Sequence, residues 1–216
     1  MGKQFERIEP AHREFIEKQR IFFNASATAE GRVNVSPRDV ASLRVLDTNG
    51  VVYLDQTGSG NETAAHLREN GQVDGRLTLM FCAFEGAPMV LRLYGRGRIV
   101  SRGSSEYAAM LTSEFGGVET PGARQMVLLK VESVQTSCGY GVPLFEYVGE
   151  RTTLTRWAEA RADWKSIGGR RICIASMVCR PDCSKMFPPL DPDCLSAAPG
   201  PIAKERPALY TEDTCL

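Results

Sequence analysis

The sequence predicts a mainly β protein, in which an antiparallel sheet of six or more strands closes into a small barrel with a few short helices beside it. Three observations support this fold class. Several segments are rich in strand-forming residues or alternate apolar and polar residues. The helical segments are too short and too few for a doubly wound parallel sheet. One long strand contains Gly95 and Gly97, which indicates a bulge or a barrel corner.

Seven segments are expected to be strands. They are residues 21–28, 32–38, 42–48, 51–57, 76–84, 88–101 and 124–138. The second should stop at Pro37, because proline has no N–H to donate to a ladder. The third and fourth are joined through Asn49-Gly50, a dipeptide typical of a two-residue type I′ hairpin in which both residues have positive φ.

Four segments are expected to be helices, at residues 10–20, 61–70, 104–115 and 151–165. The first has a proline at its start and a small apolar face. The second has Asn or Thr available as caps and Gly71 as a stop. Ser104 or Ser105 should cap the third, and Gly116 should end it.

The chain is expected to divide into a barrel domain, residues 1–168, and an irregular tail, residues 169–216, which carries most of the proline and cysteine. Five of the seven cysteines lie in the last quarter of the sequence. Cys179, Cys183 and Cys194 match no common zinc spacing, and both histidines lie far away in the sequence. We therefore predict no metal site.

The composition argues against several classes of partner. Lys plus Arg and Asp plus Glu both number 26, so the net charge is zero. A neutral chain without a basic cluster gains little from counterion release on nucleic acid or from an anionic membrane. No stretch reaches the length of a membrane span, and the charged N-terminus lacks the apolar core of a secretory signal. We expect a cytoplasmic protein that binds neither nucleic acid nor membrane.

Residues 55–63 carry the first chemical signal. Thr57, Gly58, Ser59, Gly60, Asn61 and Thr63 lie between a predicted strand and a predicted helix. Glycines let the backbone approach a ligand, and hydroxyl, amide and backbone N–H donors suit a phosphate. A simple turn with a helix cap explains the same residues. The segment is neither a Walker loop nor a dinucleotide fingerprint.

Several motifs together resemble a known family. RVNVSPR, LRVLDTNGVVYLD, QTGSGNETAAHLREN, RLTLMFCAFEGAPMVLRLYGRGRIV and VQTSCGYGVP resemble, in order and spacing, the FMN-binding split barrels related to pyridoxamine 5'-phosphate oxidase. The likeness covers about residues 5–168. It implies an antiparallel, six-stranded, Greek-key-type split barrel that forms a homodimer, with FMN in the clefts between the two subunits.

The resemblance also implies which residues contact the cofactor. These are Arg44, Val45 and Leu46 along the flavin ring; Thr57, Ser59, Gly60, Asn61 and Thr63 around the phosphate; and Gln135, Thr136 and Ser137, with Cys138, approaching from a neighbouring strand or subunit. Ser36 and Arg38 resemble pocket-lining positions near the ring. Without the resemblance, Arg44 also fits a surface residue in an ion pair, and Val45 and Leu46 fit an ordinary core.

Two departures from the family pattern stand out. Better-known oxidases of the family carry an Arg–Lys pair in the phosphate loop, whereas this chain has Ser59-Gly60-Asn61, which leaves Arg44 or Arg68 as the balancing charge. The tail lacks the basic, Trp-containing segment that completes the substrate pocket of true pyridoxamine phosphate oxidases. We therefore expect a different small-molecule substrate.

Two functions follow as hypotheses. The first is an FMN-dependent oxidoreductase, in which the cofactor supplies the redox chemistry, so that no catalytic side chain needs to be nominated. The second is a protein that binds flavin or deazaflavin without turnover, as a carrier or sensor. The two differ in whether bound flavin is reduced by a donor and reoxidised.

Overall fold

The computed structural model of the chain describes residues 2–58, 60–68 and 75–160. In chain order the elements are β1 (Lys3–Phe5), α1 (Pro10–Lys18), β2 (Ile21–Ala27), β3 (Asn34–Asp39), the 3-10 turn η1 (Val40–Ser42), β4 (Leu43–Val45), β5 (Gly50–Gln56), α2 (Glu62–Leu67), β6 (Gly75–Cys82), β7 (Val90–Ser101), α3 (Ser105–Phe115), β8 (Ala123–Ser137) and α4 (Thr153–Glu159). The predicted tail, residues 169–216, lies outside the described residues, so the domain boundary stays a prediction.

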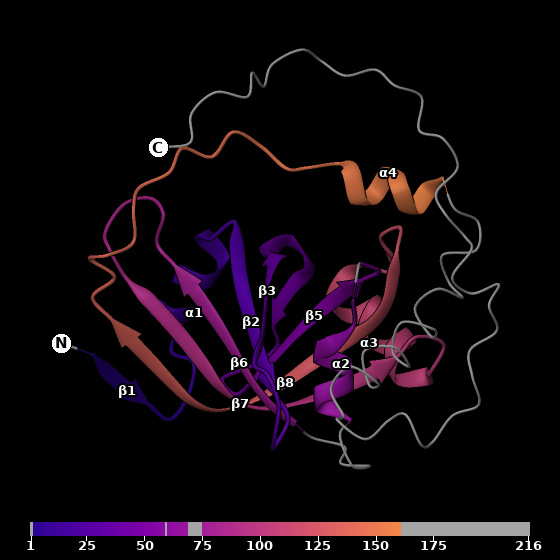
Figure 1. The fold of residues 1–216 in the computed structure, drawn as a ribbon, viewed down its shortest axis with the longest axis horizontal. Helices are drawn as coiled ribbons and strands as arrows, with labels where there is room; N and C mark the ends of the chain where they lie inside the picture. The colour runs from indigo at the N-terminus through magenta and orange to yellow at the C-terminus, as the bar shows by residue number, and fades with distance from the viewer. Residues whose placement is uncertain (1, 59, 69–74, 161–216) are drawn as a thin grey trace. The chain divides into compact units, whose positions relative to one another are not determined.

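The strands form one antiparallel sheet that curls strongly on itself (Figure 1). Neighbouring strands follow the order β3-β2-β6-β7-β8-β5-β4, with β1 beside β8. The run β5-β8-β7-β6 is a Greek key, because β5 lies next to the far end of the β6-β7-β8 meander. This confirms the predicted fold class. The described sheet has eight strands rather than six, because β1 and β4, of three residues each, extend it.

Gly95 marks the bend of the longest hairpin, as the sequence predicts. The register between β7 and β8 shifts between Tyr94 and Gly95, which is the signature of a β-bulge. A β-carbon on Gly95 would overlap the carbonyl oxygen of Lys130 on β8. Glycine is therefore required here because the two backbones approach each other closely.

Two local predictions are wrong. Pro37 does not end its strand: β3 continues to Asp39, and Pro37 pairs with Phe23 of β2. This is possible because β3 is at the edge of the sheet, so no neighbour needs the missing N–H. The β4–β5 connection is also not a two-residue type I′ turn.

The β4–β5 loop is longer than predicted because Asn49 has another role. The last pair of the ladder is Val45 with Val51, and Gly50 has no positive φ. The Asn49 backbone N–H donates to Asp47 Oδ1 at 2.6 Å, and its side-chain amide donates to the Val131 carbonyl at 3.1 Å. Asn49 thus ties the loop to β8 instead of forming a tight hairpin.

The predicted helices are present and, within the described residues, shorter than expected; the predicted stop at Gly71 and residues 161–165 of the fourth helix lie outside the described residues. The Ser104 hydroxyl accepts from the Tyr107 N–H at 3.1 Å, and Gly116 ends α3 with φ of 62°, as predicted. Asn61 precedes α2 but makes no side-chain cap hydrogen bond. Within the residues that the structure describes, no helix has the length and apolar character needed to cross a membrane.

The core has two layers, one on each face of the sheet. Inside the curl, Phe22 lies edge-on to Tyr53 with ring centroids 5.4 Å apart and stacks on Phe81 at 5.8 Å. On the outer face of β5 and β8, α3 packs through the buried Tyr107 against Met126 and other apolar residues. Strand alternation explains the division, since successive residues point to opposite faces.

We expect Gly95→Ala to destabilise the fold by about 2 kcal/mol or more, because the added methyl group meets backbone that cannot move aside. Gly141→Ala is the control: a β-carbon there has nothing within 4 Å, and we expect a change within about 0.5 kcal/mol. Urea unfolding of both variants measures the difference. Equal stabilities would show that the bulge tolerates a side chain.

Candidate functional site

A buried carboxylate is the centre of a polar cluster at one end of the curled sheet. Asp55 on β5 is 2% exposed. Its Oδ2 accepts from Arg124 Nε at 2.8 Å and from Gln125 Nε2 at 2.7 Å, both on β8. Arg38 Nη1 on β3 lies 3.0 Å from Asp55 Oδ1 as an ion pair without hydrogen-bond geometry. One side chain therefore joins three strands.

Strand register brings these groups together. Asp55 and Gln125 are directly opposite each other in the β5–β8 ladder, and the register shifts just after, between Asp55 and Gln56. Val51, Tyr53 and Asp55 share the inner face of β5, because side chains of alternate residues point the same way. The carboxylate thus continues the inner apolar row and needs buried partners of opposite charge.

The predicted phosphate loop lies against this cluster. Arg124 Nη1 donates to the Gly60 carbonyl at 3.0 Å, and Gln125 Nε2 donates to Asn61 Oδ1 at 2.9 Å. Thr63 Oγ1, on α2, accepts from Asn24 Nδ2 at 2.7 Å. Three of the predicted residues, Gly60, Asn61 and Thr63, are therefore brought together. Ser59 lies outside the described residues.

Two buried polar atoms of this loop have no hydrogen-bond partner in the described residues. They are Thr57 Oγ1 and Asn61 Nδ2, on residues that are 0% and 2% exposed. Buried polar groups are rarely left unpaired, because each costs about 1–3 kcal/mol. Both atoms can donate a hydrogen bond. Because both atoms belong to the predicted phosphate loop, they are candidates to bind an anionic ligand.

The charges of the cluster also suit an anion. Two guanidinium groups, of Arg38 and Arg124, face the single carboxylate of Asp55. Burial raises the pKa of the nearby Tyr53 phenol, and the Asp55 carboxylate raises it further, so the phenol stays neutral. The phenol therefore adds no negative charge to the cluster, in which two arginines face one carboxylate.

Arg44, Val45 and Leu46 lie elsewhere, on β4 and its end. Arg44 Nε donates to the Glu114 carbonyl at 3.0 Å, Arg44 Nη1 donates to the Leu43 carbonyl at 2.7 Å, and the guanidinium carbon lies 4.8 Å from the centre of the Phe115 ring. Val45 is buried in the inner core, and Leu46 packs against the outer one. In this chain Arg44 links β4 to the end of α3.

Arg68, the other arginine expected to balance the phosphate, is exposed, and its Nη2 donates to Ser101 Oγ at 3.2 Å. Arg124 is instead the arginine hydrogen-bonded to the loop. The predicted site residues do not include Arg124, Asp55 or Gln125. One signal was available: in the strand at 51–57, Asp55 has the same parity as Val51 and Tyr53, which predicts a buried carboxylate.

Gln135 and Ser137 lie at the opposite end of β8. Gln135 Oε1 accepts from the Tyr94 hydroxyl at 3.1 Å, and Ser137 Oγ accepts from Arg92 Nη1 at 3.2 Å. Thr136, between them, pairs with Leu91. Ten residues of strand separate Gln125 from Gln135, which is roughly 30 Å along β8. Within one chain, the two predicted halves of the site are not brought together.

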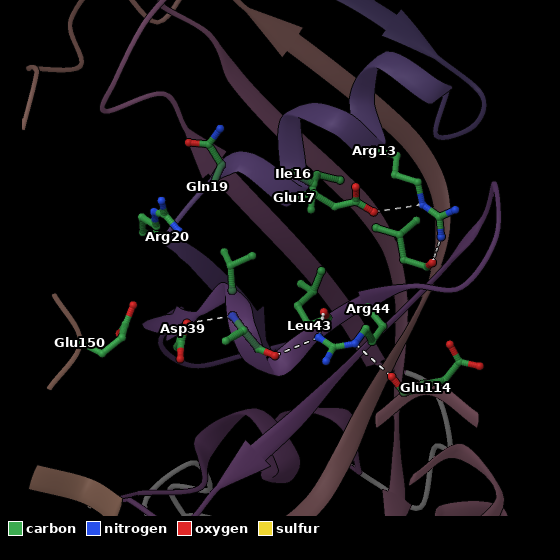
Figure 2. Close-up of a pocket in the computed structure, with 13 residues that line it drawn as sticks. Arg13, Ile16, Glu17, Gln19, Arg20, Asp39, Leu43, Arg44, Glu114 and Glu150 are labelled. Carbon is green, nitrogen blue, oxygen red and sulfur yellow. Dashed lines mark hydrogen bonds and ion pairs between the residues drawn. The ribbon is translucent and has the colours of Figure 1, made fainter. Parts of the chain in front are cut away.

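A pocket of about 450 Å³ lies between α1, η1, β4 and the end of α3 (Figure 2). It includes Arg44 and Val45 but none of the residues predicted around the phosphate. Several of its polar groups bind the chain itself: Arg13 donates to the Val45 carbonyl, and Asp39 Oδ1 accepts from the Ala41 N–H at 2.8 Å. The pocket is therefore a weaker candidate than the Asp55 cluster.

Cys82 is buried, and burial raises the pKa of its thiol, whereas Cys138 is exposed. Among the described residues, no group of three or more histidine, cysteine, aspartate or glutamate side chains is placed to hold a metal ion. The five cysteines from Cys173 onward lie outside the described residues.

Comparison with known proteins identifies the family. The family model described as pyridoxamine 5'-phosphate oxidase matches residues 8–138. The chain therefore belongs to the pyridoxamine 5'-phosphate oxidase family, and its curled antiparallel sheet is a split barrel of that family. The matched range contains every residue that the sequence analysis assigned to cofactor binding.

Three individual relatives share between 15% and 39% sequence identity with this chain. The pyridoxamine 5'-phosphate oxidase family protein ustO of Aspergillus flavus is 39% identical over 145 residues, which are 66% of this chain and 56% of that protein. The chain thus spans little more than half the length of this relative. Among solved structures, HupZ of Group A Streptococcus has 22% identity and a TM-score of 0.46, covering 59% of this chain and 91% of that one. A pyridoxamine 5'-phosphate oxidase-related, FMN-binding protein of Nostoc punctiforme has 15% identity and a TM-score of 0.42, covering 60% and 84%.

We expect Asp55→Asn to lower the free energy of unfolding by about 3 kcal/mol or more, because it leaves two inward-facing guanidinium groups without a balancing charge. Glu106→Gln is the control. It breaks the more exposed ion pair with Arg98, whose loss should cost less than about 1 kcal/mol. Chemical denaturation compares the two variants. Similar small losses would show that Asp55 does not hold the strands together.

Proposed function

We propose that this protein is an FMN-dependent oxidoreductase that holds its flavin at a homodimer interface and acts on a small-molecule substrate. The observation that carries the proposal is the family match over residues 8–138, which includes all of the predicted cofactor residues. The substrate is not identified by the fold. The pyridoxamine phosphate substrate of the family's best-known members is not part of the proposal.

The cluster around Asp55 fits the phosphate of FMN. Its unpaired Thr57 and Asn61 side chains are hydrogen-bond donors, and the two arginines carry more charge than the Asp55 carboxylate neutralises. Phosphate oxygens accept hydrogen bonds and prefer arginine partners. The departure from the family's Arg–Lys pair is therefore compensated by arginines from β3 and β8, which lie far from the loop in sequence.

When bound, FMN supplies hydride and electron transfer through its ring. In the proposal, Thr57, Gly60, Asn61 and Thr63 hold the phosphate end. The backbone of Arg44, Val45 and Leu46 flanks the ring, and Gln135, Thr136 and Ser137 approach it from the partner subunit. The chain's own task is binding, orientation and exclusion of water.

The homodimer is supported by an apolar outer face on the sheet. On β3, the residues that point inward are polar, whereas Val35 is 58% exposed and points outward. Its neighbours across the sheet are Ala25 and then Thr78, and the adjacent row is Pro37, Phe23 and Met80. A strand at the surface usually points its apolar residues inward and its polar residues outward, and on β3 this pattern is reversed. An apolar face of this kind suits coverage by a second copy of the chain.

The same outer face carries one half of the predicted site. Gln135 pairs with Arg92, which pairs with Met80, so Gln135 belongs to the row that contains Phe23. A partner that covers this face would meet Gln135 directly. This supports a site built from the Asn61 end of one subunit and the Gln135 end of the other.

Release of the bound small molecule tests the cofactor. We expect the purified protein to be yellow, with two visible absorbance bands, and to release about one FMN per chain on denaturation, because the two sites of a symmetric dimer are equivalent. Mass spectrometry of the released molecule separates FMN from a deazaflavin. A nicotinamide donor under anaerobic conditions should bleach the bands, and oxygen should restore them. Flavin that binds but is never reduced would assign a carrier role instead.

Val35→Asp tests the interface. Burial of an unpaired carboxylate against an apolar partner should weaken dimerisation by about tenfold or more and lower the FMN content with it. Val118→Asp is the control, since Val118 is similarly exposed, at 68%, and belongs to the connection after α3 rather than to β2 or β3. Sedimentation equilibrium measures the dissociation constants. If both variants dimerise like the wild type, the interface lies elsewhere.

A further inference from the structure

Three basic side chains lie in one row across the centre of the sheet, on β6, β7 and β8 (Figure 1). Arg96 on β7 is directly opposite Arg76 of β6 on one side and Lys130 of β8 on the other. Residues directly opposite each other in a ladder point to the same face, and all three are exposed. The row is on the outer face, because the neighbours Leu77 and Leu129 belong to the inner core. The three cations are far apart in the sequence, and only the strand register brings them together.

The chain itself balances little of this charge. Like charges directly opposite each other destabilise a sheet. Arg96 Nε lies 3.8 Å from Glu132 Oε1, which is too long for a hydrogen bond, and the two side chains are 50% and 57% exposed. In the described part of the chain, Arg76 and Lys130 make no ion pair, and Arg76 Nη2 donates to the Thr28 carbonyl at 2.8 Å. Three cations therefore face one loosely held carboxylate.

Protection of a sheet edge does not explain the row. Exposed basic side chains often keep an edge strand from pairing with another chain, but β6, β7 and β8 each have a neighbouring strand on both sides. The β-bulge between Tyr94 and Gly95 lies just before Arg96, and bulges re-aim side chains beside functional sites. The excess positive charge on these central strands therefore suits an anion that binds from outside.

We propose that Arg76, Arg96 and Lys130 bind a pyrophosphate group, either free or as part of a nucleotide. Directly opposed residues have Cα atoms about 5 Å apart, so the row spans about 10 Å, which suits a compact anion with two linked phosphates. Arginine pairs with phosphate through two parallel N–H donors. A single short row in a chain of zero net charge offers no track for an extended polyanion.

The row is separate from the surfaces proposed above. On β2 it continues to Ala27, which pairs with Arg76, whereas the apolar rows proposed for the dimer pass through Ala25 and Phe23. It also shares no residue with the proposed flavin site. The inference therefore goes beyond the proposed function and does not depend on it.

Isothermal titration calorimetry of the full chain with inorganic pyrophosphate, ADP and inorganic phosphate tests the site. We expect a dissociation constant of roughly 0.1 mM for pyrophosphate at low salt, and binding at least about tenfold weaker for inorganic phosphate, which carries fewer charges. Added salt should weaken both, because exposed charges are screened. ADP that binds more tightly than pyrophosphate would identify a nucleotide as the source of the group, and equal binding would identify the pyrophosphate group alone.

Arg96→Gln removes the central charge of the row. We expect it to weaken pyrophosphate binding by about tenfold or more. It should also raise the melting temperature of the ligand-free protein, because it removes two like-charge contacts. The control is Arg151→Gln, which removes an exposed arginine from the connection before α4 and should leave the dissociation constant within about twofold.

Four results would overturn the inference. A wild-type protein that binds neither pyrophosphate nor ADP at millimolar concentrations has no such site. Equal loss of binding in the Arg96 and Arg151 variants would show an effect of net charge rather than of the row. An Arg96→Gln variant less stable than the wild type would show that the chain already balances this charge. A single-stranded oligonucleotide that binds more tightly than ADP would replace the compact ligand with an extended polyanion.

Discussion

The structure depends on one buried carboxylate. Asp55 is held by Arg124 and Gln125 from β8 and faces Arg38 from β3, so a single charge joins strands from the edge and the centre of the sheet. A carboxylate that is 2% exposed is stable only with such partners. Because Arg124 also donates to the Gly60 carbonyl, the same interaction fixes the loop that leads into α2.

This arrangement has a consequence for function. A second arginine gives the cluster more positive charge than one carboxylate neutralises, and the loop keeps hydrogen-bond donors without acceptors. The residues proposed for the other side of the flavin lie roughly 30 Å away along β8. In the proposal, one chain therefore carries two half-sites at opposite ends of a strand. Association of two chains through the apolar outer face of β2 and β3 would combine them.

Local patterns in the sequence predicted most of the fold. The glycine bulge at Gly95, the Ser104 cap and the Gly116 stop each follow from short-range geometry. The failures have tertiary causes: Pro37 is tolerated because its strand is at an edge, and Asn49 leaves the tight turn to bind β8. The site was predicted only in part. Its loop was visible as a motif, but Asp55 and Arg124 are 69 residues apart, and their pairing depends on strand order.

Subunit complementation tests most directly whether the site is shared. Asn61→Asp changes the loop residue that contacts Gln125 at one end of β8, and Gln135→Glu changes the other end of that strand. Both changes are near-isosteric, and each alone should abolish most FMN binding. When the two variants are co-expressed, half of the dimers are mixed and contain one intact site, so FMN binding should recover to roughly a quarter of the wild-type level. A mixture that binds no more FMN than its parents would contradict a site shared between subunits.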